Sequence, residues 1–203
     1  MADTVWDRIE RARARHDVLQ HPFYARWSAG ELSAAELARY SGQYRHAVTA
    51  IADLSDAAAA ALPERPELAE HAAEERDHIA LWDGFVGAVG GDGDTAPTGE
   101  TADCVEVWTE RDGALAALAR LYAIESGQPQ ISETKLEGLA EHYGVDSAEG
   151  TRYFTVHRGR DVEHAAEGRE LLEELIATPA DEDAVVAAAE RAFAANWRLL
   201  DGV

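Results

Sequence analysis

Apolar residues recur at helical spacing along most of this chain, and this pattern limits its fold more than any other feature. Within 33–62 the large apolar residues lie three or four positions apart, at Leu37, Tyr40, Tyr44, Val48 and Ile51. No stretch alternates apolar and polar residues for long enough to form a strand. The sequence therefore predicts an all-α fold without a sheet.

Glycine and proline divide the chain into about seven predicted helices. Ser33 and Glu36 have the spacing of a capping box, and Pro63 and Pro66 follow the end of the helix that they open. The predicted helices cover 5–16, 33–62, 67–89, 102–126, 131–143, 147–177 and 179–200. The loop at 90–99 is too short for a linker, and 203 residues suit one core. We predict a single domain over 1–203, built as a helical bundle.

The charge balance excludes several classes of partner. There are 39 acidic and 18 basic residues, and the formal net charge of -21 argues against nucleic acid and anionic membranes as partners. No apolar run reaches 18 residues, and the first residues lack a basic and apolar signal. A soluble, cytoplasmic protein is expected, with a homodimer as one possible assembly.

Lysine is almost absent. Lys135 is the only lysine among the 18 basic residues, and the others are arginines. An acidic excess with little lysine is typical of adaptation to high salt, so we interpret the composition as halophilic. A single remaining lysine then suggests a specific role, although chance survival at the surface is the alternative.

His157, Asp161 and His164 form the pattern His-x3-Asp-x2-His. At about 100° per residue, side chains at i, i+4 and i+7 project from one face of a helix. Two imidazoles and a carboxylate suit iron, manganese or zinc. The competing interpretation is a polar face in contact with solvent, so the question is whether other helices supply further ligands.

Two other helices supply candidate ligands. Glu75 and His78 have the Glu-x-x-His spacing of dinuclear sites in helical bundles, and Glu74 shares the same face. Glu125 ends an apolar run, where a buried carboxylate is costly unless it binds a cation. Together these residues predict a site for two divalent ions, at Glu75 or Glu74, His78, Glu125, His157, Asp161 and His164. The remaining histidines are not assigned as ligands: His16, His21, His46, His71 and His142.

Several sequence segments resemble the haem-oxygenase-like dimetal oxidases, and among them the CADD-like p-aminobenzoate synthases. The resemblance covers most of the chain, and is strongest at 21–27, 30–32, 78–82, 122–126 and 153–164. It implies a haem-oxygenase-like fold and a dinuclear centre of two irons, or iron with manganese, that activates dioxygen with an external reductant. The electron donor is not identified.

The resemblance also implies an unusual substrate. Such proteins are thought to make p-aminobenzoate, a precursor of folate-type cofactors, from one of their own tyrosines and a lysine. The matching positions are Tyr24 and Lys135, with Tyr40 and Tyr122 as pocket tyrosines. An arginine could not replace this lysine, because a guanidinium is not a transferable primary amine.

Three alternatives share the predicted fold or lack chemistry altogether. A TenA-like hydrolase of thiamine metabolism needs a catalytic cysteine, but Cys104 lies outside the corresponding segment, 113–125. A PqqC-like oxidase of quinone metabolism would need no metal ligands, and neither would a non-enzymatic interaction protein. Metal content separates these alternatives from the dimetal oxidase.

Overall fold

The computed structural model describes residues 3–203, and within them it contains helices and no strands. The α-helices are α1 (Val5–Arg15), α2 (Pro22–Ser28), α3 (Ala34–Ala61), α4 (Pro66–Ala88), α5 (Gly99–Trp108), α6 (Ala114–Glu125), α7 (Gln128–Gly138), α8 (Ala148–Leu175) and α9 (Pro179–Asp201). A 3-10 turn, η1 (Val18–Gln20), precedes α2, and a π-helical turn, η2 (Leu139–Tyr143), follows α7. The all-α fold predicted from the sequence is confirmed.

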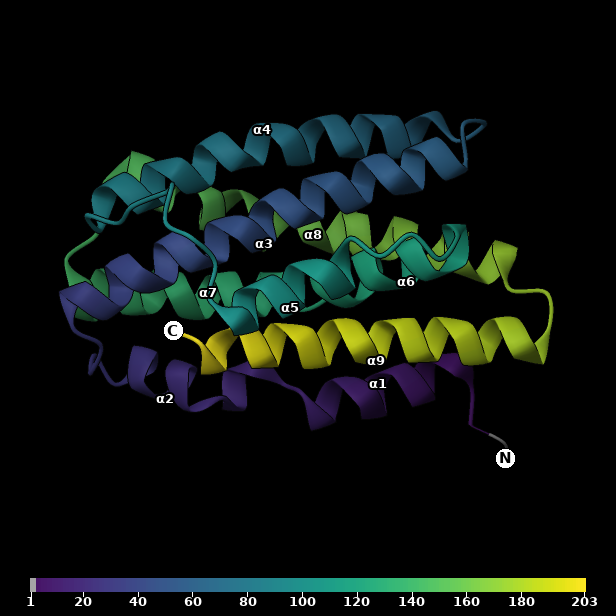
Figure 1. The fold of residues 1–203 in the computed structure, drawn as a ribbon, viewed down its shortest axis with the longest axis horizontal. Coiled ribbons are helices and arrows are strands. Elements are labelled where there is room, and N and C mark those ends of the chain that lie inside the picture. Colours follow the sequence, from purple (N-terminus) through teal and green to yellow (C-terminus); the bar gives the residue numbers. More distant parts are fainter. Residues whose placement is uncertain (1–2) are drawn as a thin grey trace.

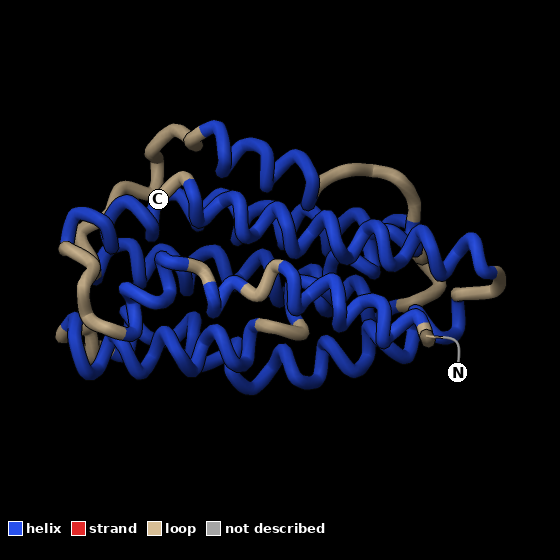
Figure 2. Tube along the Cα trace, turned by 90° about the horizontal axis from the view of Figure 1, so that it is seen from below, coloured by secondary structure: helices blue, strands red, loops and turns tan. Residues whose placement is uncertain are grey.

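The long helices run side by side along the long axis of the molecule (Figure 1). α4 packs between α3 and α8, and α6 packs against both α8 and α9. Seen from below, the molecule remains a set of helices joined by loops of different lengths (Figure 2). The buried apolar side chains form one cluster that includes Trp27, Trp82 and Trp108. This packing leaves α4, α6 and α8 facing one another across the interior.

Two elements differ from the sequence prediction. The predicted helix 102–126 is two helices, because the chain turns before α6 at Gly113, whose φ of 112° is unfavourable for other residues. The segment after residue 20, which we did not predict as helical, forms α2. Its N-cap is His21, whose ring Nδ1 accepts a hydrogen bond of 3.0 Å from the main-chain N–H of Phe23.

Small residues let α4 and α8 approach closely at one end. A Cβ atom on Gly84 would lie 2.7 Å from the carbonyl oxygen of Glu149, and one on Gly150 would lie 2.8 Å from Cβ of Ala88. The C-terminal end of α4 thus lies beside the N-terminal end of α8, and the two helices are antiparallel. This orientation decides which of their polar side chains meet.

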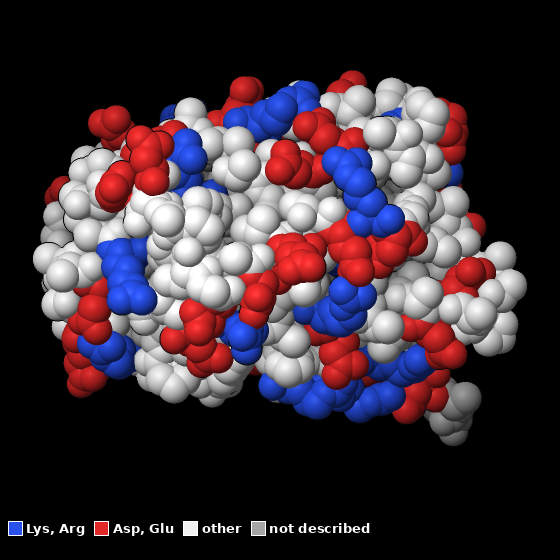
Figure 3. Space-filling model, in the orientation of Figure 1, with Lys and Arg blue, Asp and Glu red and all other residues white. Residues whose placement is uncertain are grey.

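The exposed surface carries the acidic excess seen in the sequence. In Figure 3, acidic side chains are spread over the visible face with arginines between them. Many arginines form ion pairs with these carboxylates, as in Arg8–Asp183 and Arg45–Asp83. Among the described residues, no helix is long and apolar enough to cross a membrane.

Candidate metal centre

One face of α4 presents two imidazoles and a carboxylate to the interior. His71, Glu75 and His78 lie at i, i+4 and i+7, so they share that face. Glu75 and His78 are 2% and 6% exposed, and His71 is partly buried. Of these three residues, the sequence prediction lacked His71.

The facing side of α8 presents the predicted His-x3-Asp-x2-His group. His157, Asp161 and His164 are all buried. Because α4 and α8 are antiparallel, the imidazole rings meet in crossed pairs. The ring centroids of His78 and His157 are 4.5 Å apart, and those of His71 and His164 are 3.9 Å apart.

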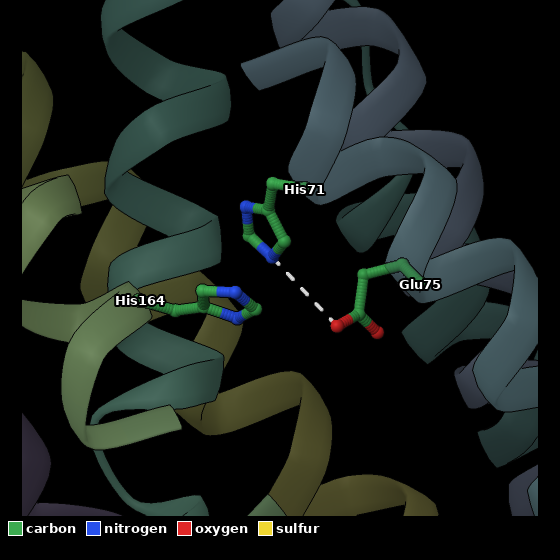
Figure 4. Close-up of side chains that lie close together, drawn as sticks. All are labelled: His71, Glu75 and His164. Carbon is green, nitrogen blue, oxygen red and sulfur yellow. Dashed lines mark ion pairs between the residues drawn. The ribbon is translucent and has the colours of Figure 1, made fainter. Parts of the chain in front are cut away.

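These pairs form two groups of possible metal ligands, and Glu75 belongs to both. One group is His71, Glu75 and His164 (Figure 4), and the other is Glu75, His78 and His157. In each group the donor atoms lie within 4.8 Å of one another. Glu75 Oε1 is 3.1 Å from His78 Nδ1 and 3.7 Å from His71 Nε2. We name the seven-residue set formed by both groups with Glu125 and Asp161 the polar cluster.

Glu125 reaches the polar cluster from the C-terminal end of α6. Its Oε1 lies 3.0 Å from His71 Nε2, and the side chain is buried. Burial raises the pKa of Glu125. Burial lowers the pKa of His71, but Glu125 and Glu75 outweigh it and raise this pKa to about 10. The two carboxylates thus strongly attract positive charge at this position.

Several buried polar atoms of the polar cluster have no hydrogen-bond partner. They are His157 Nε2, both Asp161 carboxylate oxygens and both His164 ring nitrogens, together with His71 Nε2 and Glu125 Oε1, which form an ion pair without hydrogen-bond geometry. Burial, reinforced by Glu125 and Glu75, raises the pKa of Asp161 to about 9. Unpaired buried donors and acceptors are costly. Divalent cations would satisfy these atoms, and imidazole with carboxylate is a donor set that suits iron and manganese.

His157 is oriented as a ligand would be. Its Nδ1 lies 2.7 Å from the main-chain oxygen of Tyr153, to which it donates, and this leaves the Nε2 lone pair directed elsewhere. Burial lowers the pKa of His157 to about 4, so the neutral form is favoured near pH 7. A neutral imidazole held by a main-chain hydrogen bond is a common metal ligand.

The structure separates Glu74 from Glu75, which the sequence could not do. The Glu74 carboxylate receives two hydrogen bonds of 2.8 Å from Arg160, and its side chain is 37% exposed. Its nearer oxygen is 3.4 Å from His164 Nε2, at the edge of the polar cluster. Glu75 is buried within both ligand groups. The assignment of ligand roles to these residues stays a prediction.

Lys135 lies inside the protein, on α7, and is 1% exposed. Its Nζ is between 4.7 and 5.9 Å from the centroids of five aromatic rings: Tyr24, Tyr40, Tyr44, Trp82 and Phe154. We call this set the aromatic cage. Burial lowers the pKa of Lys135 to about 7, so a large fraction of the amine is neutral near pH 7.

Tyr153 connects the aromatic cage to the polar cluster. Its ring stacks on His157 with centroids 3.8 Å apart, and meets Trp82 edge to face at 4.8 Å. Tyr24 and Tyr40, both predicted from the resemblance, belong to the cage. Tyr122, which was predicted with Tyr40 as a pocket tyrosine, is not part of the cage and packs against Trp6 of α1, with centroids 5.2 Å apart.

A cavity of about 230 Å³ lies on the other side of the polar cluster. His71, Glu125 and His164 line it together with leucines of α4, α6 and α8.

Cys104, the only cysteine, is buried elsewhere in α5, and burial raises the pKa of its thiol. A thiol in such surroundings is a poor nucleophile, which argues against a cysteine-dependent hydrolase.

The sequence is similar to those of known proteins over most of its length. A family described as iron-containing redox enzymes matches residues 38–197. A 4-aminobenzoate synthase of Nitrosomonas europaea is 32% identical, with 94% of this chain and 87% of that protein covered. A 4-aminobenzoate synthase of Chlamydia trachomatis is 31% identical, with 86% of this chain and 82% of that protein covered.

Solved structures show the same fold at lower identity. A domain of unknown function from Shewanella denitrificans, with a haem-oxygenase-like fold, has a TM-score of 0.83 and 19% identity, covering 100% of this chain and 92% of its own. A TenA homologue from Pseudomonas syringae has a TM-score of 0.80 and 16% identity, covering 97% and 89%. These likenesses establish the haem-oxygenase-like fold predicted from the sequence.

Proposed function

Because the chain belongs to the family of iron-containing redox enzymes, we propose that it is an oxygen-activating oxidoreductase that forms 4-aminobenzoate at a dinuclear metal centre. The observation that carries this proposal is Lys135. The only lysine of the chain is buried, and its Nζ lies 5.9 Å from the ring centroid of Tyr24. This pairing supports Lys135 as the nitrogen source and Tyr24 as the carbon source. The product would serve the synthesis of folate-type cofactors.

Six predicted ligands would hold two metal ions. They are Glu75, His78, Glu125, His157, Asp161 and His164, all of them buried. Two irons, or iron with manganese, would supply the redox chemistry with dioxygen as oxidant and an external reductant. Metal-ion chemistry of this kind needs a site shielded from bulk water. Burial of these ligands provides that shielding, except where the cavity reaches Glu125 and His164.

The product defines what must happen to the two side chains. In 4-aminobenzoate a carboxyl group and an amine lie para to each other on one ring, as the methylene and the hydroxyl do in tyrosine. The Tyr24 methylene carbon must therefore be oxidised to a carboxyl group, with cleavage of its bond to Cα. The ring C–O bond must be replaced by a C–N bond, so the ring oxygen leaves as water, and the Cε–Nζ bond of Lys135 is broken, with Cε oxidised to an aldehyde by dioxygen. Each protein molecule can react once.

The aromatic cage prepares Lys135 for this role. A primary amine attacks only as the neutral base, and burial lowers the pKa of Lys135 to about 7. The rings of the cage exclude water from the amine and hold it beside Tyr24 and Tyr40. Through Tyr153, which stacks on His157, the cage adjoins the polar cluster. The reacting side chains thus lie next to the proposed metal centre.

Isotopic labelling tests the proposal directly. Protein made with ¹⁵N-lysine is loaded with iron and incubated with reductant in air, and the small-molecule product and the polypeptide are both analysed by mass spectrometry. We expect ¹⁵N in 4-aminobenzoate and a matching loss of mass from the protein. Unlabelled product would contradict the role of Lys135.

Substitutions at the two donor residues complete the test. Lys135→Arg and Lys135→Met should both bind metal and yield no product, and the methionine variant guards against misfolding caused by a buried guanidinium. Tyr24→Phe should also yield none, because it lacks the ring oxygen that is replaced. Tyr143→Phe is the matched control, since Tyr143 donates a 2.9 Å hydrogen bond to the Trp27 main-chain oxygen outside the cage. Product from Tyr24→Phe would contradict the carbon source.

A further inference from the structure

The two helices that face each other in the polar cluster carry the same ligand spacing. On α8 the pattern is His157-x3-Asp161-x2-His164, and on α4 it is His71-x3-Glu75-x2-His78. Each pattern places two imidazoles and a carboxylate on one face of its helix. His71 therefore stands in α4 where the predicted ligand His157 stands in α8.

Because α4 and α8 are antiparallel, the two patterns meet at two possible metal positions, and these positions have different surroundings. His78 meets His157 at one position, and His71 meets His164 at the other, with Glu75 within reach of both. Figure 4 shows His71 and Glu75 of α4 pointing toward His164 of α8. Glu125 adds a carboxylate only beside His71, at 3.0 Å. We call the position of His71, Glu125 and His164 the outer position, and that of His78 and His157 the inner position.

The cavity touches only one of these positions. Its lining includes His71, Glu125 and His164, and excludes His78 and His157. At the outer position, both His164 ring nitrogens are buried without a hydrogen-bond partner, and His71 Nε2 and Glu125 Oε1 are buried 3.0 Å apart as an ion pair without hydrogen-bond geometry. One ligand atom each of His71, Glu75 and His164 lies within 4.8 Å of the others, and buried polar atoms gathered in this way beside a cavity favour a bound cation over an empty polar pocket.

We propose that His71 is a ligand of the metal ion at the outer position, and that this ion exchanges through the cavity while the inner ion is enclosed. The inference rests on the proposed function, because it takes the polar cluster to hold two ions. It adds a seventh residue to the predicted ligands and makes the two positions chemically unequal. The outer ion has His71, Glu125 and His164, with Glu75 shared between both ions.

Metal stoichiometry tests the role of His71. Metal-free protein is titrated anaerobically with Fe(II), desalted, and analysed for bound iron by mass spectrometry. Wild-type protein should retain two ions per chain, and His71→Ala one. Loss of the ligand should weaken binding of the second ion by at least about 100-fold, beyond the effect typical of residues that only orient ligands.

His71→Gln separates a ligand from a hydrogen-bond donor. Its side-chain amide can still donate to Glu125, but is a weak metal ligand, so this variant should also retain one ion. His142→Gln is the matched control: His142 is exposed, its Nε2 lies 3.1 Å from the Ser28 main-chain oxygen, and two ions should remain. Two ions bound with unchanged affinity in His71→Gln would overturn the proposal, and would leave His71 as a charge partner of Glu125.

Chelation kinetics test the exchange route in the unmodified protein. With excess EDTA, iron should leave the wild-type protein in a fast and a slow phase of equal size, and His71→Gln should show the slow phase alone. Release of both ions at one rate would overturn the difference in access. Wild-type protein that binds no iron would instead contradict the proposed function itself, so the two failures are distinguishable.

Discussion

The polar cluster and the aromatic cage are neighbouring buried regions built from different side chains: one from carboxylates and imidazoles, the other from aromatic rings around a single amine. The polar cluster gathers three carboxylates and four imidazoles, and several of their atoms lack partners. The cage surrounds one amine with five rings. Burial raises the pKa of Asp161 to about 9 and lowers that of Lys135 to about 7. In both regions burial opposes ionisation, but only the polar cluster offers donor atoms that a cation could satisfy.

This contrast indicates that the two regions have different roles in the proposed reaction. Metal ions would restore the charge balance of the polar cluster, whereas Lys135 needs to remain uncharged to act as a nucleophile. Tyr153 contacts both regions, since its ring stacks on His157 and meets Trp82 edge to face. The chain thus keeps an amine and a group of carboxylates close together without forming an ion pair between them.

Removal of Asp161 should abolish the chemistry. Asp161→Ala deletes a carboxylate that has no other partner, so metal content should fall and 4-aminobenzoate should drop below detection, with circular dichroism unchanged. Glu163→Ala is the control on the same helix, because the Glu163 side chain is 64% exposed and pairs with Arg160. Product formation at normal iron loading in Asp161→Ala would show that this carboxylate is not a ligand.

Removal of the Lys135 amine should stabilise the protein while abolishing product. At pH 8 the unfolded chain binds a proton at Lys135 that the folded chain largely lacks, because the pKa falls from 10.5 to about 7. Stability thus decreases as pH falls from about 10 to 7, and Lys135→Met should gain about 3 kcal/mol at pH 8. Urea unfolding measures the gain. Arg158→Met, at an exposed ion pair with Glu133, should gain nothing.

Asp161 should show the opposite pH dependence in metal-free protein. Its folded pKa of about 9 lies above the ordinary 3.8, so the folded state holds a proton that the unfolded chain releases. Stability therefore decreases as pH rises from about 4 to 9. Relative to Asp161→Asn, metal-free wild-type protein should lose about 2.7 kcal/mol between pH 6 and pH 8. An equal stability difference at both pH values would contradict the raised pKa.

The smallest effect is expected at Glu74. Its carboxylate pairs with Arg160 at a position that is partly exposed, and such pairs contribute at most about 1 kcal/mol. Glu74→Gln should therefore keep two bound irons and lose less than about 1 kcal/mol of stability. Glu75→Gln, its buried neighbour, should lose iron. Equal iron loss in the two variants would remove the distinction between them.

Much of the fold and part of the site could be predicted because they depend on local spacing. Helical periodicity predicts the long helices, and the i, i+4, i+7 arrangement of His157, Asp161 and His164 follows from helix geometry alone. Glu125 could be singled out because it ends an apolar run. The lone Lys135 could be singled out by composition, and the resemblance assigned it a role.

What the sequence left open depended on contacts between helices. His71, Glu75 and His78 have the same spacing as the residues of the α8 motif, so the sequence already contained a pattern that could have singled out His71. Its significance appears only when antiparallel packing brings it to His164. The choice between Glu74 and Glu75 depended on Arg160 of α8, which binds the former. Spacing along one helix is set by local backbone geometry, whereas the pairing of faces is set by packing of the whole core.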